Sequence, residues 1–281
     1  MVLEDLFKPS VVRHRPYLAL GYGFFFTFIG FLISYLLLRS VISVATIFLT
    51  TLLLIPTMMK LLKMEERVVR KHGLKNFFSN HKDIFEVYLY SFLGVFIAFV
   101  ILGMIMKEGS FSTLFDFQTR FLRLSDFVDA GTVQEFVKTS VMPTFWQAVD
   151  LFAHNLLVVV ICFALSFFYG ASAIFLIILN GSVFASFIVF VIRTLSQNAL
   201  SGVQAFLFFM IHLLPEVSGF LLAAIAGGVV SKAISVEKIR SKAFRNVFKD
   251  ATMLMLIAMG LVLLGTVLEV LVTTRLFQMF Y

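Results

Sequence analysis

The sequence predicts an all-α polytopic transmembrane helix bundle. Hydrophobic residues make up 60% of the 281 positions, charged residues only 14%, and 36 positions are Phe. The mean hydropathy is +0.99. A chain with this composition has too little polar surface to cover a water-soluble core of ordinary proportions, so we expect a membrane protein.

Apolar stretches close to or above the roughly 18–20 residues that cross a bilayer predict about seven spans. They are Tyr17–Leu38, Val41–Met59, Ile84–Met106, Phe152–Phe168, Ala173–Ile192, Val203–Val230 and Ala251–Val272. The first stretch follows Arg13 and Arg15, but it is too long for the apolar part of a typical signal peptide, so we expect an uncleaved helix.

The basic residues predict the orientation of the chain in a cell membrane. If the N-terminus is cytoplasmic, 16 of the 23 Lys and Arg residues lie inside and 7 lie outside. The positive-inside rule therefore favours a cytoplasmic N-terminus and an outside C-terminus. The net charge of +7 then reports topology and contact with anionic lipid headgroups at the inner face, and we expect no nucleic-acid partner.

Two segments between spans are amphipathic enough to lie at the membrane surface. We expect interfacial helices in the outer loop 107–146, including one at Thr132–Val141, and in the inner loop 60–83. The outer loop could instead form a lid over a central cavity, and the inner loop could be a solvated linker. We divide the chain into an N-terminal hairpin with its basic inner segment, residues 1–83, and a membrane core, residues 84–281.

The sixth apolar stretch carries the most informative polar residues. His212 and Glu216 are four residues apart and therefore share one face of a helix. A carboxyl group in hydrocarbon costs roughly 2.5 kcal/mol or more, so Glu216 should have a partner or face inward. Pro215 cannot donate to the carbonyl of Ile211, which predicts a kink and a free acceptor beside both side chains.

Two amide side chains should lie at a similar depth. With a rise of 1.5 Å per residue, Asn155, His212, Asn180 and Glu216 fall at roughly 10, 13, 17 and 20 Å below the outer boundary. We predict one intramembrane polar cluster of these four residues. It could bind a proton, a monovalent cation or a divalent metal, or it could hold the bundle together by hydrogen bonds between helices.

Small residues in the same helices predict close packing of backbones. They are Gly181, Gly219, Gly227 and Gly228. Such residues let helices approach in lipid, either within one chain, which we favour, or between two chains of a homodimer.

No recognisable catalytic motif is present. The sequence has no His-Glu-x-x-His, no Gly-x-Ser-x-Gly and no Walker loop, so we expect no enzymatic activity and no cofactor. The single cysteine, Cys162, excludes a disulfide within the chain and is expected to serve packing.

The order of these residues resembles the stage II sporulation protein M family, in its archaeal form. Four stretches carry the resemblance, and Leu213 stands where the family usually has Gly. The stretches are Phe78–Ile84 followed by Phe92-Leu93-Gly94, Leu114–Gln118, His154-Asn155 through Gly170 to Asn180-Gly181, and His212-x-x-x-Glu216 ahead of Ala226-Gly227-Gly228. They cover roughly residues 78–230.

The resemblance implies an integral membrane protein of undetermined biochemical role, either a partner-recruiting scaffold or a transport component. The sporulation member is a membrane scaffold that localises cell-wall-degrading partners, so a scaffold or assembly component with protein partners is our first hypothesis. The alternative is a channel or transporter that binds a cation or proton at Glu216 and His212. Fold likeness alone does not choose between them.

Overall fold

In the computed structural model, the chain is helical throughout the part that is described. The structure describes residues 12–13, 15–72, 77–123, 142–169, 171–238 and 241–281. No strand occurs among these residues, which confirms the all-α fold.

Seven helices are long and apolar enough to cross a membrane, which confirms the predicted number of spans. Their bounds are α3 Leu18–Leu37, α4 Ile42–His72, α5 Phe77–Ile105, α9 Phe145–Phe168, α10 Ser172–Leu195, α11 Ala199–Val236 and α12 Lys242–Leu268. A 3₁₀ turn, η1 Arg39–Val41, links the first two. The last span continues from α12 through a π-helix, η2 Glu269–Thr273, into α13 Thr274–Phe280.

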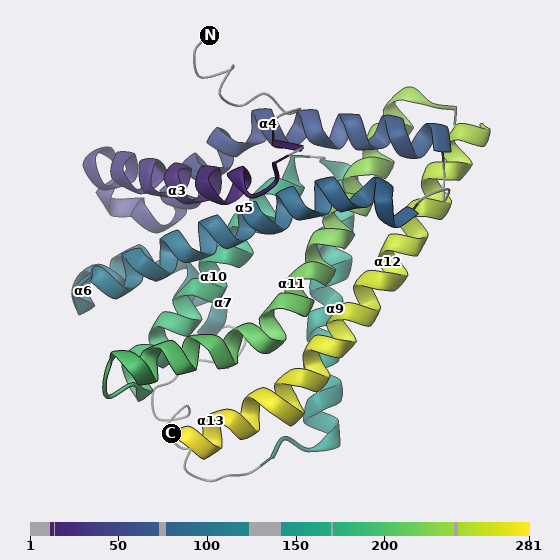
Figure 1. Ribbon diagram of the computed structural model, residues 1–281. Coiled ribbons are helices and arrows are strands. Elements are labelled where there is room, and N and C mark those ends of the chain that lie inside the picture. Colours follow the sequence, from purple (N-terminus) through teal and green to yellow (C-terminus); the bar gives the residue numbers. More distant parts are fainter. Residues whose placement is uncertain (1–11, 14, 73–76, 124–141, 170, 239–240) are drawn as a thin grey trace.

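Helix α11 is the centre of the bundle. It packs against α12, α9, α10 and α4, and α3 packs on the other side of the molecule against α5 and α4 (Figure 1). Helices α3 and α9 are peripheral, and apolar side chains such as Phe25 and Ile161 remain exposed on them. In a bilayer these outward faces contact lipid, as expected for the outer helices of a membrane bundle.

Polar residues fix where two of the spans begin. Thr144 and Gln147 form a reciprocal capping box at the start of α9, and Asn198 and Ser201 do the same at the start of α11. These side chains satisfy backbone groups that have no partner inside the helix. The starts of α9 and α11 are therefore set by local sequence rather than by the limits of the apolar runs.

The described part of the outer loop forms two short helices, α6 Glu108–Leu114 and α7 Asp116–Arg123. Helix α7 is attached to the bundle, because the hydroxyl of Ser43 donates to Oε1 of Gln118 at 2.6 Å. Arg193 at the end of α10 donates to the carbonyl groups of Gly103 and Met106. The helix expected at Thr132–Val141 lies outside the described residues.

The inner segment does not form a helix of its own. Residues 60–72 extend α4 by several turns, and Phe77 begins α5. The cause is an apolar inner face that continues past the predicted span and includes Leu61, Leu62 and Val69, all buried against the bundle. The polar members of this face, discussed below, point inward as well.

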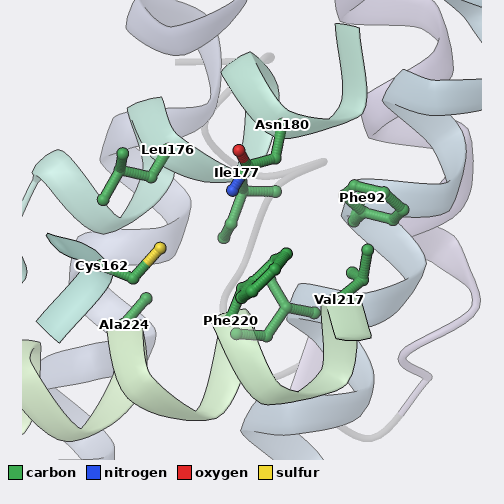
Figure 2. A pocket seen from close by; sticks show the side chains of 9 residues that line it. Phe92, Cys162, Leu176, Ile177, Asn180, Val217, Phe220 and Ala224 are labelled. Carbon is green, nitrogen blue, oxygen red and sulfur yellow. The ribbon is translucent and has the colours of Figure 1, made fainter. Parts of the chain in front are cut away.

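The interior is tightly packed. Its best-defined cavity is about 10 Å³, roughly the space of one water molecule. Asn180 and Cys162 line it among apolar side chains from α5, α10 and α11 (Figure 2).

Candidate functional site: an intramembrane carboxylate and imidazole cluster

Helix α11 presents His212 and Glu216 to the interior on one face. Both side chains are buried, with 5% and 3% exposure. Pro215 lies inside the helix, which continues without a break from Ala199 to Val236 and bends along its length (Figure 1). The segment is thus one bent span, as expected where a proline removes a backbone hydrogen bond.

Asn155 on α9 is the direct partner of Glu216. Its Nδ2 donates to Oε1 of Glu216 at 2.8 Å, and the Asn155 side chain is itself buried. A hydrogen bond of this kind ties α9 to α11 and occupies one oxygen of the carboxyl group. The structure therefore brings together Asn155, His212 and Glu216, three of the four residues that we grouped by depth.

Asn180, the fourth residue, lines the small cavity together with Cys162 (Figure 2). Its depth in the membrane was estimated from sequence, but depth alone does not fix the direction in which a helix face points. In α10 the neighbouring Gly181 faces Phe92 and Val95 of α5.

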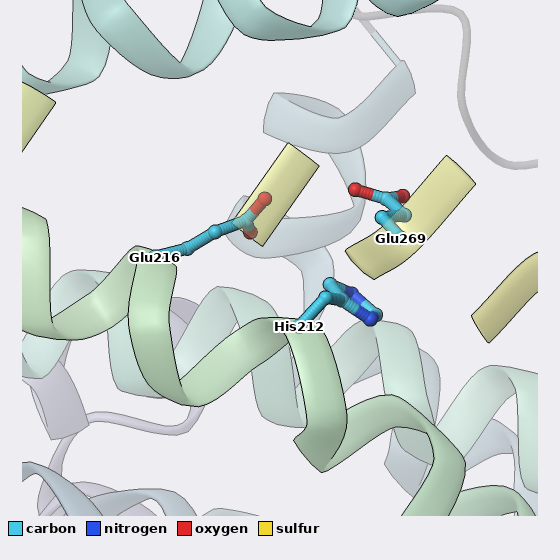
Figure 3. Close-up of side chains that lie close together, drawn as sticks. All are labelled: His212, Glu216 and Glu269. Carbon is cyan, nitrogen blue, oxygen red and sulfur yellow. The ribbon is translucent and has the colours of Figure 1, made fainter. Parts of the chain in front are cut away.

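Glu269 joins the cluster from the last span. His212, Glu216 and Glu269 each offer a ligand atom, and these atoms all lie within 4.8 Å of one another (Figure 3). Glu269 is half-buried and begins the π-helix η2. π-Helical turns are rare and occur frequently at functional sites, where they redirect a side chain.

The sequence analysis missed Glu269. The signal was present, because Glu269 is the one acidic residue within the apolar stretch Ala251–Val272. An unpaired carboxyl group in hydrocarbon is costly, so Glu269, like Glu216, should serve a purpose. The partnership of the two residues depends on how α11 and α12 pack, which periodicity does not reveal.

Thr273, at the other end of η2, orients the imidazole of His212. Its Oγ1 lies 3.1 Å from Nδ1 of His212 and donates to the carbonyl of Phe208 at 3.4 Å. In the tautomer with hydrogen on Nδ1, the ring donates to Thr273, whose own hydroxyl hydrogen goes to that carbonyl. The other ring nitrogen, Nε2, then has its lone pair free for a proton or a metal.

Gly265 provides the space that Glu216 occupies. A Cβ atom at this position would lie 2.2 Å from Cγ of Glu216, so a larger residue on α12 would displace the carboxyl group. The other small residues of α11 also serve contacts within the chain: Gly219 meets α12 at Ala258, Gly227 meets α9 at Phe163, and Gly228 meets Leu62 of α4.

A second group of buried ionisable residues lies where α4, α5 and α12 meet. Nδ1 of His81 is 2.7 Å from Glu65, and its Nε2 is 2.8 Å from Asp250. All three side chains are at most 5% exposed. Because each ring nitrogen faces a carboxylate oxygen, both carry hydrogen and the ring is a cation bridging two anions.

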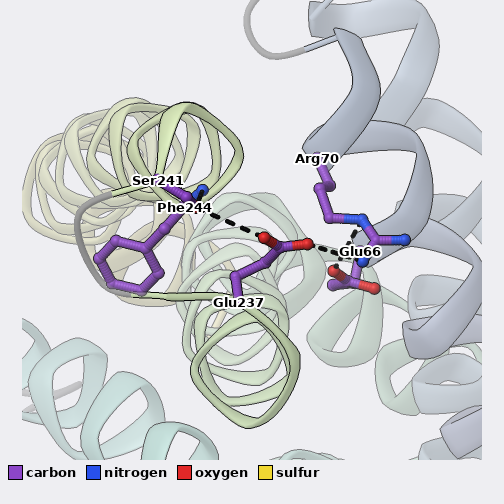
Figure 4. Close-up of polar contacts among 5 residues, drawn as sticks. All are labelled: Glu66, Arg70, Glu237, Ser241 and Phe244. Carbon is purple, nitrogen blue, oxygen red and sulfur yellow. Dashed lines mark hydrogen bonds and ion pairs between the residues drawn. The ribbon is translucent and has the colours of Figure 1, made fainter.

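Further ion pairs surround this second group. Arg70 lies between Glu66, at 3.6 Å, and Glu237, at 2.9 Å, while Ser241 donates to Glu237 (Figure 4). Sequence reasoning missed these contacts because it assigned residues 60–83 to the lipid surface. The same charges instead connect the inner ends of three spans.

The chemical potential of the His212 cluster follows from its composition. Two carboxyl groups at this short separation repel each other when both are ionised. The pair is therefore stable only with a shared proton or a bound cation. Among the described residues, neither Glu216 nor Glu269 forms an ion pair with Lys or Arg. The arrangement can therefore hold a proton or a cation.

Fold and site together define a polytopic helical membrane protein with an ionisable cluster inside its bundle. The model of the family described as Stage II sporulation protein M matches residues 91–274, well over half of the chain. The chain belongs to this family, as the resemblance of its motifs indicated. Searches of curated proteins and of solved structures found no match.

Proposed function

We propose that this chain is a non-enzymatic multi-pass membrane scaffold or assembly component. The observation that supports this most is the pairing of the buried polar groups: Glu216 and His212 are both hydrogen-bonded to other helical segments, and the best-defined cavity holds only about one water molecule. A protein that moves a solute needs a path that is open to one side of the membrane. In a scaffold, by contrast, the polar cluster fixes the positions of α9, α11 and α12.

Charged surfaces support membrane and partner contacts for such a scaffold. Four basic side chains are exposed along one side of the inner half of α4: Lys60, Lys63, Arg67 and Lys71. With the N-terminus in the cytoplasm, this stripe lies at the inner face, where anionic headgroups attract Lys and Arg by roughly 1 kcal/mol each. Protein partners, and a second copy of the chain, would meet the exposed loops and peripheral helices.

A second candidate, a transporter or channel for a cation or proton, is favoured by one observation. Two irregular helix segments, the bend at Pro215 and the π-helix η2, face each other and carry the three ionisable groups. Interrupted helices with ionisable residues near the bilayer interior are typical of ion-binding sites in transporters. In this case the tightly packed interior would represent one state of the transport cycle.

The substitution Glu216→Gln separates the two candidates. A scaffold with this structural cluster should show no proton flux in reconstituted vesicles before or after the substitution. The variant should lose thermal stability, at a cost of about 1–3 kcal/mol, because the amide of Gln still accepts from Asn155 but cannot share a proton with Glu269. Flux is measured with a pH-sensitive dye inside the vesicles, and stability by thermal unfolding in detergent.

The exposed Glu108 on α6 supplies the matched control, since Glu108→Gln removes a charge in the outer loop and should change neither measurement. Flux in the wild type that disappears in Glu216→Gln but persists in Glu108→Gln would overturn the scaffold proposal in favour of transport.

A further inference from the structure

We infer that His212, Glu216 and Glu269 form a binding site for one divalent transition-metal ion, of which Zn²⁺ is the representative. The inference does not depend on which function is correct, because a metal ion at this place is compatible with a scaffold and with a transporter. Its evidence is the arrangement of the three ligands and of the side chains that hold them.

The donor set suits such an ion. Imidazole nitrogen together with carboxylate oxygen binds zinc and neighbouring metals, whereas sites made only of oxygen favour magnesium or calcium. Each carboxylate can bind through one or both oxygens, so these three side chains can complete a tetrahedral shell. Three helical segments contribute to the site and its supports, namely α9, α11 and the last span.

The distances are close to those that a metal needs. The ligand atoms lie within 4.8 Å of one another. For bonds of about 2.0–2.2 Å the ligand atoms must come within roughly 3.5–4 Å of each other, a contraction of about 1 Å. Rotation of the two glutamate side chains, which have three rotatable bonds each, supplies this movement without a shift of the backbone.

Neighbouring residues form hydrogen bonds to two of the three ligands, as is usual in metal sites. Oγ1 of Thr273 lies 3.1 Å from Nδ1 of His212 and can accept its hydrogen when Nε2 serves as the ligand, and Asn155 donates to one oxygen of Glu216. Hydrogen bonds to the ligands fix their orientation and raise their affinity for metal.

The charge of the site agrees with a divalent ion. Two carboxylates and a neutral imidazole carry two negative charges in a buried place, and no described Lys or Arg forms an ion pair with either glutamate. A divalent cation neutralises the site completely, which greatly lowers the cost of keeping both carboxylates inside the membrane.

Metal content of the purified protein tests this inference. The full chain in detergent is stripped with a chelator, loaded with Zn²⁺ and freed of excess ion, and bound zinc is measured by mass spectrometry together with the protein concentration. We expect one zinc per chain in the wild type and none in His212→Gln or Glu269→Gln. The control His154→Gln, which removes an exposed histidine on α9, should keep one.

Two further measurements keep the test decisive if a ligand variant fails to fold. Cobalt loaded into the wild type should give the visible absorption of a four-coordinate ion with nitrogen and oxygen ligands. Thr273→Val, which keeps all three ligands, should weaken zinc binding on the order of tenfold in competition with a chromophoric chelator. Less than half an equivalent of zinc in the wild type, or full zinc content in a folded His212→Gln variant, would overturn the inference.

Discussion

The imidazole of His81, on α5, connects the inner ends of three spans. His81 contacts Glu65 of α4 through one ring nitrogen and Asp250 of α12 through the other. Without the ring, two buried carboxylates would face each other with no cation between them. Removing one member of a buried ionic group costs more than the group itself contributes, because the remaining charges stay buried.

Substitution of His81 by Leu should therefore lower the free energy of unfolding by roughly 3–5 kcal/mol. The next residue provides the control. Lys82 is 68% exposed and pairs with Glu86 at 3.8 Å, so Lys82→Gln should cost no more than about 1 kcal/mol. Both effects are measured by denaturant or thermal unfolding of the purified protein in detergent. Equal, small losses in the two variants would contradict the bridging role of His81.

The same residue shows the limit of sequence reasoning at this scale. His212 and Glu216 are recognisable because they are four residues apart in an apolar run, which is local information. His81 and Glu65 are separated by a chain reversal, and Asp250 lies in another span. Their contact is created by tertiary packing, and a basic surrounding sequence is equally typical of a lipid-facing segment.

At the scale of elements, the existence of the helices could be predicted and their irregular turns only in part. Seven apolar stretches predict seven spans because hydrocarbon requires every backbone group to be paired within a helix. Pro215 predicts the bend of α11 from the sequence alone. The π-helix at Glu269–Thr273 has no comparable signal, since no proline or glycine lies within it.

The packing of α11 against α12 explains why the acidic residues of both helices meet. Gly219 lets α11 approach Ala258 and Val262, and Gly265 admits Glu216 two turns further along α12. These small residues bring helices close to one another within the chain. Which helix each glycine would contact depended on the order of the spans around α11, and the sequence does not contain that order.

At the scale of the whole molecule, seven spans would place the N-terminal and C-terminal helices' outer ends on opposite sides of the membrane. We propose that the N-terminus is cytoplasmic, because the excess of Lys and Arg falls on that side. Both groups of buried ionisable residues then have a defined order along the last span: the His81 group lies toward the cytoplasmic end, at Asp250, and the His212 cluster lies further from the cytoplasm, at Glu269.

Cysteine labelling tests this orientation in intact cells. The starting variant is Cys162→Ser, because Cys162 is the only native cysteine. A cysteine at exposed Ser112 in α6 should react with a membrane-impermeant maleimide, whereas one at exposed Lys238 should react only after the membrane is permeabilised. The reverse pattern would contradict the proposed orientation and leave the fold intact.

The central claim is that α11 and the last span meet at Glu216 inside the membrane, and a disulfide between them tests it most directly. In the Cys162→Ser background, Glu216→Cys is combined with Gly265→Cys, because a Cβ at residue 265 would lie 2.2 Å from Cγ of Glu216, within reach of a sulfur bridge. The control pair combines Glu216→Cys with Gly260→Cys, a position with no neighbouring atom within 4 Å. After mild oxidation and proteolysis, mass spectrometry should find the linked peptides for 216 and 265 and none for 216 and 260. Absence of the first link, or equal amounts of both, would contradict the account.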